Sequence, residues 1–339
     1  MTLVTDSAVW ISEAEVVSLM DMGQAIGALE RGLMLEAEGE AENMVKTHVE
    51  WDGATLHAIG AVFPSTGICG TKTWAHTPGG ATPMLILFDS HTGGLKAVIE
   101  AFALGQLRTA AASGVATRWL ARGDANEFAM IGTGKQALAQ VAAVLAVRPV
   151  RHIRVFGRNE ARRDQFIARV REEFAVEVSS AASIRAAVEG ASIITLATRA
   201  TEPILTADMV EAGAHINSIG AIVPTRAEVA QDVLARTSQI VTDSVPQAQK
   251  LSRELIEFFA ANTAGWDAVQ PLAQIVAQRF SRSASDDLTL FKALGVGISD
   301  LSLGIALYRS ALEQNLGYRF APPQRVAPRL HGTVANHIG

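Results

Sequence analysis

Cysteine is almost absent from this chain of 339 residues, and long hydrophobic runs are missing altogether. The one cysteine, Cys69, cannot form an internal disulfide, so the composition gives no sign of an oxidising compartment. No window reaches the roughly 18 uncharged apolar residues that a membrane-spanning helix needs. The start, MTLVTDSAVW, lacks the basic segment and apolar core of a signal peptide. We therefore expect a soluble, cytoplasmic protein.

A concentration of charge of one sign is missing too. The formal net charge is −5, and lysines and arginines are scattered rather than grouped, which argues against a nucleic-acid-binding surface. Hydrophobic residues make up 49% of the chain and charged residues 19%, so it can bury a large core. We expect no nucleic-acid, membrane or metal partner, and the length fits two domains.

From about residue 125, short apolar runs alternate with amphipathic helical stretches. EFAMIG, HIRVFG, AVEV and ASIITLAT predict four strands, the helices between them include residues 159–174, and HINSIG and SQIVTD supply two more strands. Strands separated by helices indicate right-handed crossovers and a parallel sheet covered on both faces. The prediction is an α/β, doubly wound Rossmann domain over residues 123–296.

The rest of the chain has a different pattern. A helix predicted over residues 13–38 leads into β-prone segments such as GTKTWAH and MLILFD, then into a long helix, RTAAASGVATRWLAR. Residues 300–317 predict a helix with no strand after it, which packs back on the N-terminal part. Residues 1–122 together with 297–339 therefore form a discontinuous α+β domain. The proline-rich residues 321–339 are expected to be loosely ordered or to lie on a partner subunit.

The glycines of MIGTGKQA, residues 130–137, admit two interpretations. A triphosphate loop needs a glycine at 129 and a hydroxyl at 136, but these positions hold Ala129 and Gln136. A dinucleotide turn fits, because the segment follows a strand and opens a helix. A glycine turn without a ligand stays open as the plain alternative. The cofactor-binding candidates are Gly132, Thr133, Gly134, Lys135, Gln136 and Ala137.

The end of the second strand distinguishes the nicotinamide cofactors. An NAD site usually has an acid there, whereas an arginine accommodates the 2′-phosphate of NADP. Here the strand ends in Arg158 and Asn159, with Arg162 one turn later, and Glu160 already lies at the helix start. A guanidinium pairs bidentately with phosphate. This favours NADP(H), with NAD(H) possible and with ordinary surface arginines as the alternative.

Three cations of the N-terminal part suit an anionic substrate. Lys72 lies on a predicted strand, Arg108 and Thr109 lie at the predicted start of a helix rich in small residues, and Lys46 alternates with apolar positions. Cations without a nearby acid in sequence fit a carboxylate-bearing ligand. Taken singly, each is more often a surface charge.

Several segments resemble one known family. LRTAAASGVATRWLAR, IGTGKQA, GAHINSIGA and LFKALGVGISDLSLG, in this order and spacing, resemble the ornithine cyclodeaminase/mu-crystallin family, and GTKT matches its G-x-K-[TV] segment. The resemblance covers roughly residues 10–320. It implies a Rossmann domain and a discontinuous domain that binds the substrate and forms a homodimer.

The resemblance also implies roles for single residues. Lys72 matches the catalytic, substrate-binding lysine and Arg108 the carboxylate-binding arginine, while Lys46 stands where an arginine is commoner. Arg108 and Thr109 are implied to lie near the cofactor phosphates. The residues implied to line the nicotinamide are Ala197, Thr198, Ile219 and Val296. His76 and Asp300 are weaker candidates, for which a structural role is the simpler reading.

One departure from the family pattern bears on the reaction. Cyclodeaminases of the family carry an aspartate in a segment G-G-D-x-P-G-K-x-E-L, whereas this chain reads GAIVPTRAEV and places Ile222 there. An isoleucine cannot bind an ammonium or take a proton. Glu228 keeps the later glutamate and is predicted to belong to the following helix.

Three functions follow. The first is NAD(P)H-dependent interconversion of an α-imino acid, such as pyrroline-2-carboxylate, piperideine-2-carboxylate or an acyclic imino acid, with the amino acid. The second is an ornithine cyclodeaminase-type ammonia lyase with tightly bound NAD. The third is a mu-crystallin-like NADPH-dependent binding protein. Ile222 favours the first.

Overall fold

The computed structural model describes residues 7–330, and within this range eight strands form one sheet in which every neighbouring pair is parallel. The spatial order is β11-β10-β9-β12-β13-β16-β14-β15. The strands are β9 (Glu127–Ile131), β10 (His152–Phe156), β11 (Glu177–Ser180), β12 (Ile193–Leu196), β13 (His215–Ser218), β14 (Thr237–Thr242), β15 (Gln270–Pro271) and β16 (Leu288–Lys292).

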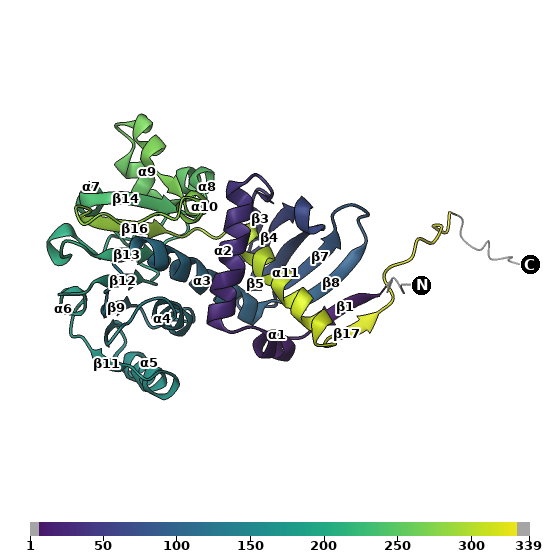
Figure 1. Ribbon diagram of the computed structural model, residues 1–339, viewed down its shortest axis with the longest axis horizontal. Helices are drawn as coiled ribbons and strands as arrows, with labels where there is room; N and C mark the ends of the chain where they lie inside the picture. Colours follow the sequence, from purple (N-terminus) through teal and green to yellow (C-terminus); the bar gives the residue numbers. More distant parts are fainter. Residues whose placement is uncertain (1–6, 331–339) are drawn as a thin grey trace, which may run out of the picture.

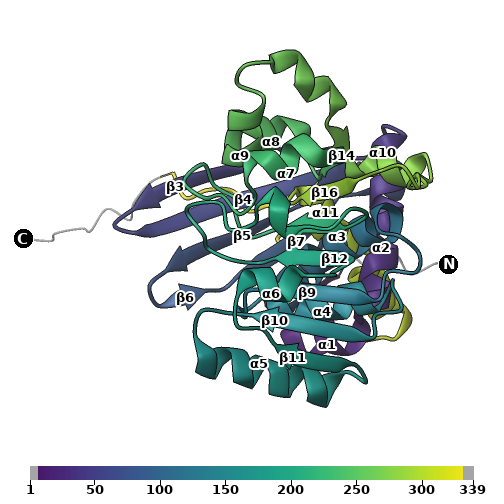
Figure 2. The same ribbon diagram turned by 90° about the vertical axis from the view of Figure 1, so that its left-hand side faces the viewer.

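Continuous apolar runs explain why this sheet is buried on both faces. All four residues of β12, IITL, are buried, as the central strands of a parallel sheet require. One face packs on α4 (Ala137–Leu145) and α5 (Glu160–Glu173). The other is covered by four short helices (Figures 1 and 2). These are α6 (Ile184–Val188), α7 (Gln231–Arg236), α8 (Val245–Leu251) and α9 (Arg253–Phe258). The predicted α/β, doubly wound parallel sheet is confirmed.

A second, mixed sheet has the order β17-β1-β8-β7-β5-β4-β2, with β3 on β4 and β6 on β5. Only the β1–β8 pair is parallel among its described strands. The strands are β1 (Ala8–Ile11), β2 (Glu42–Asn43), β3 (Thr47–Trp51), β4 (Ala54–Phe63), β5 (Ile68–Thr77), β6 (Gly80–Ala81), β7 (Met84–Asp89), β8 (Leu95–Glu100) and β17 (Tyr318–Phe320).

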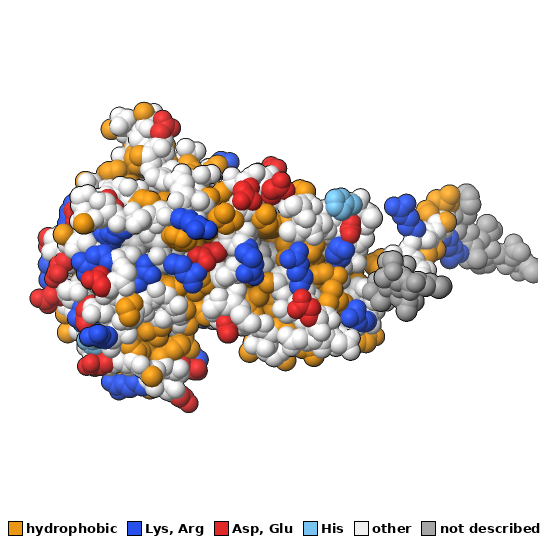
Figure 3. All heavy atoms as spheres, viewed as in Figure 1, with side chains coloured by type: hydrophobic (Ala, Val, Ile, Leu, Met, Phe, Trp, Pro, Cys, Tyr) orange, Lys and Arg blue, Asp and Glu red, His pale blue; other side chains and the backbone are white. Residues whose placement is uncertain are grey.

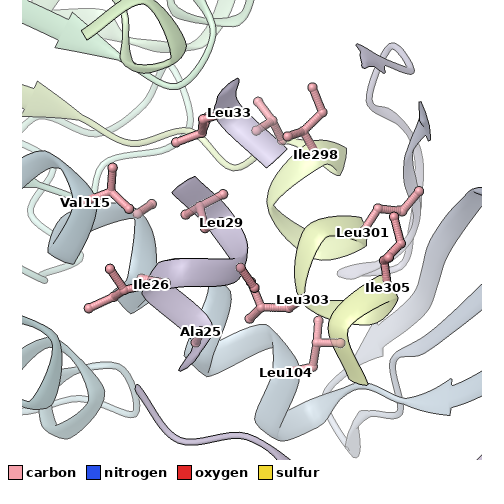
Figure 4. Close-up of a cluster of buried hydrophobic side chains, with 14 of the residues drawn as sticks. Ala25, Ile26, Leu29, Leu33, Leu104, Val115, Ile298, Leu301, Leu303 and Ile305 are labelled. Carbon is pink, nitrogen blue, oxygen red and sulfur yellow. The ribbon is translucent and has the colours of Figure 1, made fainter. Parts of the chain in front are cut away.

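Long helices fill the space between the two sheets (Figure 1). Side chains of α2, α3 and α11 interdigitate there in one apolar cluster (Figure 4). α11 approaches the mixed sheet so closely that a Cβ on Gly297 would lie 1.9 Å from the carbonyl oxygen of Gly60. The helices of this part are α1 (Glu13–Leu19), α2 (Met22–Ala37), α3 (Phe102–Leu120), α10 (Leu272–Ala277) and α11 (Gly297–Glu313).

Three predictions about this part were wrong. The single helix over residues 13–38 is two helices, because Asp21 forms a capping box with Gln24 and starts α2 anew. α3 begins at Phe102, one and a half turns before Arg108, because the distant carboxylate of Glu13 accepts from its first amides. A strand does follow the last helix, since β17 pairs antiparallel with β1.

The division into domains stays a proposal, which the two sheets support. The parallel sheet takes all its strands from residues 123–296, and the mixed sheet takes its strands from residues 1–122 and 297–339.

Residues 321–330 have no regular secondary structure, and the rest of the proline-rich tail lies outside the described residues. Within the described range, no helix combines the length and apolarity that crossing a membrane requires. Acidic and basic side chains are interspersed on the face shown in Figure 3.

Candidate active site

The glycine turn lies where β9 ends and α4 begins. Gly132 has φ +107°, a conformation that favours glycine, and its amide donates to the carbonyl oxygen of Phe156 at 2.8 Å. A Cβ there would lie 2.5 Å from the carbonyl oxygen of Ala197. The turn is therefore held tightly between the ends of β10 and β12, the two strands that flank β9.

The outer part of the turn is open, as a cofactor pyrophosphate requires. Nothing lies within 4 Å of a Cβ built on Gly134, so a ligand has room to approach the backbone. Gln136 keeps a buried side-chain oxygen without a hydrogen-bond partner in the described chain. Thr133 is half-buried beside Gly157, Lys135 is exposed, and Ala137 is buried as the first residue of α4. These residues fit a dinucleotide bound at a helix N-terminus.

The tip of β10 adjoins this turn, because β10 pairs with β9. Arg158, Asn159 and Arg162 are all exposed there. The Asn159 side-chain oxygen caps α5 by accepting from the Arg162 amide at 2.9 Å. Neither arginine forms an ion pair within the described residues, so both guanidinium groups are free to meet a phosphate.

The segments that follow β12, β13 and β16 carry the residues implied to line the nicotinamide. Ala197 and Thr198 follow β12 and are half-buried beside the glycine turn. Ile219 and Val296 are only 7% and 0% exposed. Their contact with a nicotinamide stays a prediction.

Glu228 organises these loops, which the sequence did not predict. It lies in a loop before α7, not in the following helix, and is fully buried. Its carboxylate accepts from the Thr198 amide and hydroxyl at 2.7 and 2.8 Å, and from the Gly220 amide at 2.9 Å. These bonds tie the loop after β12 to the loop after β13 at the sheet edge that carries the glycine turn.

The substrate-side cations converge on one acid. Lys72 of β5 forms a buried ion pair with Asp300 of α11, and the Arg108 Nε lies 3.4 Å from the same Asp300 oxygen. The Lys72 and Asp300 side chains are 4% and 0% exposed, and Arg108 is 18% exposed. A Cβ on Gly295, which follows β16, would lie 2.8 Å from an Arg108 Nη. The cluster therefore sits at the carboxyl edge of the parallel sheet, the edge that also carries the glycine turn.

Burial and charge tune this cluster. Burial lowers the pKa of Lys72 to about 8; Asp300 opposes the shift and Arg108 adds to it. Burial also lowers the pKa of Lys46, and the positive charge of Arg108 lowers it further. The half-buried Lys46 thus belongs to the same charged cluster. Thr109 is half-buried, with its hydroxyl donating to the Gly105 carbonyl at 2.9 Å.

Aromatic rings close one side of the cluster. Trp74, two residues along β5 from Lys72, places its ring 5.1 Å from the Lys72 Nζ and stacks on His57 of β4 at 4.7 Å. Sequence reasoning missed both, although the period of two places Trp74 on the face of Lys72. His76, named from the sequence, is exposed and lies outside the cluster.

A buried acid, Asp243, and a half-buried acid, Glu36, border the cluster. Asp243, after β14, accepts from the amides of Leu294 and Gly295 at 3.0 and 2.7 Å. Burial and then the charge of Asp243 raise the pKa of Glu36 to about 7. Neither acid was predicted from the sequence. The local sequence pattern shows only that Glu36 lies near the end of a helix and that Asp243 follows a strand.

The geometry thus places a glycine turn that fits a dinucleotide at the same sheet edge as the charged cluster of Lys72, Arg108 and Asp300. The sequence matches the ornithine cyclodeaminase/mu-crystallin family over residues 7–315. The chain belongs to this family. It is 30% identical over 270 residues to a Delta(1)-pyrroline-2-carboxylate reductase of Bacillus cereus, covering 78% of this chain and 81% of the relative.

Solved structures of the family have the same fold. One, from Thermococcus litoralis, is a Delta(1)-pyrroline-2-carboxylate reductase with NADH and L-proline; it is 27% identical and has a TM-score of 0.85 over 91% of this chain and 99% of its own. The other is an archaeal alanine dehydrogenase dimer with bound NAD, 27% identical with a TM-score of 0.85 over 93% and 99%.

Proposed function

We propose that the protein is an NADP(H)-dependent reductase that interconverts an α-imino acid and the corresponding amino acid. The observation that carries the proposal is the buried lysine, Lys72, held by Asp300 beside Arg108 at the sheet edge that bears the glycine turn. The relatives that reduce pyrroline-2-carboxylate or oxidise alanine support this class of reaction. The Thermococcus litoralis reductase holds NADH and L-proline, and the archaeal alanine dehydrogenase holds NAD.

NADP(H) is the proposed cofactor, although the two solved relatives hold NADH and NAD. The support is local: Arg158 and Arg162 are unpaired at the tip of β10, and no acid stands where an NAD site usually has one. When bound, the nicotinamide supplies or accepts the hydride.

The substrate-side residues bind the carboxylate and move the proton. Arg108 and Lys46 form charge-assisted hydrogen bonds with the carboxylate and so fix the imino carbon in place. In reduction, the carbon–nitrogen double bond takes a hydride at carbon and a proton at nitrogen. Lys72 donates that proton, since a pKa of about 8 leaves it protonated yet acidic enough near neutral pH.

Asp300 and Trp74 position Lys72 for this step. The Asp300 carboxylate holds the Nζ and favours its charged form, while the Trp74 ring limits where the ammonium can move. The second oxygen of Asp300 is buried without a hydrogen-bond partner in the described chain. It is therefore free to accept from an amino group of the product.

Cyclodeamination is disfavoured because Ile222 occupies the position of the family aspartate. Ile222 lies half-buried in the loop after β13, where an acid would bind the side-chain ammonium of ornithine.

A homodimer is also part of the proposal. One relative is a dimer, and β3 and β4 expose apolar side chains suited to an interface, namely Val49, Trp51 and Leu56.

The test is to follow NADPH and NADH oxidation separately with pyrroline-2-carboxylate, piperideine-2-carboxylate, and pyruvate with ammonia or methylamine. We expect turnover of at least one imino acid, with a higher kcat/KM for NADPH. Tight NADPH binding without oxidation of any panel member would instead support a binding protein. Ammonia release from ornithine without net cofactor consumption would support the cyclodeaminase.

A further inference from the structure

A second cavity lies at the opposite edge of the parallel sheet from the glycine turn. It has a volume of about 810 Å³ and is walled by segments that directly precede β9, β13 and β16. The cavity lies at the edge where the strands begin, and the glycine turn lies at the edge where they end. The two are therefore separated by the length of a strand, at about 3.3 Å per residue. The site proposed above uses none of its residues. Five arginines line it: Arg118, Arg122, Arg148, Arg279 and Arg282.

The acids of the cavity do not neutralise these arginines. Two aspartates line it, Asp286 and Asp287. The Asp287 carboxylate is held by two hydrogen bonds of 2.9 Å from Arg236, which is not part of the lining. Asp286 accepts from the Ser283 amide at 2.8 Å. Arg118 forms an ion pair with Glu30, which lies outside the lining. The excess of positive charge therefore comes from the other four arginines.

Two of the arginines build the wall and carry their charge without a carboxylate partner. Within the described residues, Arg148 and Arg282 donate to backbone carbonyls at the C-terminal end of α3, including those of Ala121 and Leu120 at 2.8 and 3.2 Å. Burial lowers the pKa of both arginines. Burial is also the larger cause, and the charge of Arg282 the second cause, that lowers the pKa of His215 to about 3. The interior here is positively charged, and the neutral His215 adds no charge of its own.

Two other arginines are exposed and available. Arg122 has only a 3.5 Å ion pair with Asp124 at the surface, which is worth little. Arg279 has no ion pair within the described residues, and its backbone has φ +50°, a conformation uncommon outside glycine. Strained backbone held in place is often found where a ligand binds.

We propose that this cavity binds an organic phosphate. The exposed guanidinium groups of Arg122 and Arg279 suit the bidentate recognition of phosphate oxygens, while Arg148 and Arg282 add positive charge from the wall. The Ser281 and Ser283 hydroxyls add donors, and the rings of Trp119 and Phe280 provide an apolar wall for the organic part. The cavity is large enough for a small metabolite.

Calorimetric titration with inorganic pyrophosphate tests the proposal. NADPH and NADH are both present at saturating concentration, so that the proposed cofactor site at the glycine turn is occupied and cannot bind the pyrophosphate. We expect saturable binding to the unmodified protein. The double variant Arg122→Gln/Arg279→Gln is expected to weaken it at least about tenfold, because two charge-assisted contacts are lost. Arg169→Gln, an exposed arginine of α5, is the matched control and should leave the affinity unchanged.

Thermal unfolding of each variant checks that the fold is intact, which is expected because the replaced side chains are exposed. Absence of saturable binding to the unmodified protein would overturn the proposal. So would equal affinities in the double variant and the Arg169→Gln control. Tighter binding of citrate than of pyrophosphate would overturn the assignment of phosphate as the ligand chemistry.

Discussion

Replacing Lys72 with alanine is expected to lower kcat for imino-acid reduction by about 10²–10⁴, the contribution typical of a positioned general acid. The residue is buried, has a pKa of about 8 and points at the carboxyl edge where the cofactor turn lies. In the unmodified protein, activity should fall as the pH rises through about 8, because the protonated form is lost above that pKa. Steady-state kinetics across pH measure both effects.

The exposed Lys250→Ala provides the matched control and should keep full activity. Removing Lys72 leaves the buried Asp300 with Arg108 as its only ion-pair partner within the described residues, so thermal unfolding and NADPH binding must be measured on the same sample. If a folded, NADPH-binding Lys72→Ala protein kept the activity and pH profile of the unmodified protein, Lys72 would not be the acid.

Replacing Arg158 with aspartate is expected to shift the ratio of kcat/KM for NADPH over NADH by about 100-fold towards NADH. A hydrogen bond to a charged group contributes about 1.5–3 kcal/mol, and about 1.4 kcal/mol corresponds to a factor of ten. The aspartate also repels the 2′-phosphate and offers the ribose hydroxyl an acceptor. The ratio is read from initial rates at varied cofactor concentrations with one imino acid.

The change Arg169→Asp makes the same alteration of charge within α5, the helix that follows Arg158, at a position away from its N-terminus, and should leave the ratio as it was. A preference for NADH in the unmodified protein, unaffected by Arg158→Asp, would refute the proposed NADP(H) specificity.

The parallel sheet could be predicted from the sequence because its signals are local. Strands such as β12 are short apolar runs, and helices separate them at the expected spacing. The turn at Gly132 could also be predicted, since only a glycine accommodates φ +107° against the carbonyl oxygen of Ala197. Local pattern also placed Lys72 on a strand.

Contacts between distant segments could not be predicted. β16 inserts between β13 and β14, an order that no local pattern encodes, and its residues LTLFK were not predicted as a strand. The start of α3 depends on Glu13, almost 90 residues away. The partner of Lys72 lies 228 residues further along the chain. The grouping of cations was expected from residue type. Asp300 was only a weaker candidate from the sequence, and its pairing with Lys72 became evident only from the fold.

Glu228 shows the same limit at the cofactor end. From the sequence, this glutamate of the family segment was predicted to belong to the following helix. Its carboxylate is instead buried against amides of two loops, and burial raises its pKa while Lys292 opposes that shift. A buried glutamate differs from a surface glutamate in the number of backbone amides that donate to its carboxylate. That number depends on how distant loops meet in the fold, so the local sequence does not reveal it.

The central claim is direct hydride transfer to an imino acid, and a deuterium label tests it most directly. The protein is incubated with pyrroline-2-carboxylate or piperideine-2-carboxylate and NADPH deuterated at the transferring position of the nicotinamide, and the product is analysed by mass spectrometry. The account predicts an amino acid with one deuterium on its α-carbon, formed in step with NADPH oxidation. An unlabelled product, or conversion of ornithine to proline and ammonia with no NADPH consumed, would contradict it.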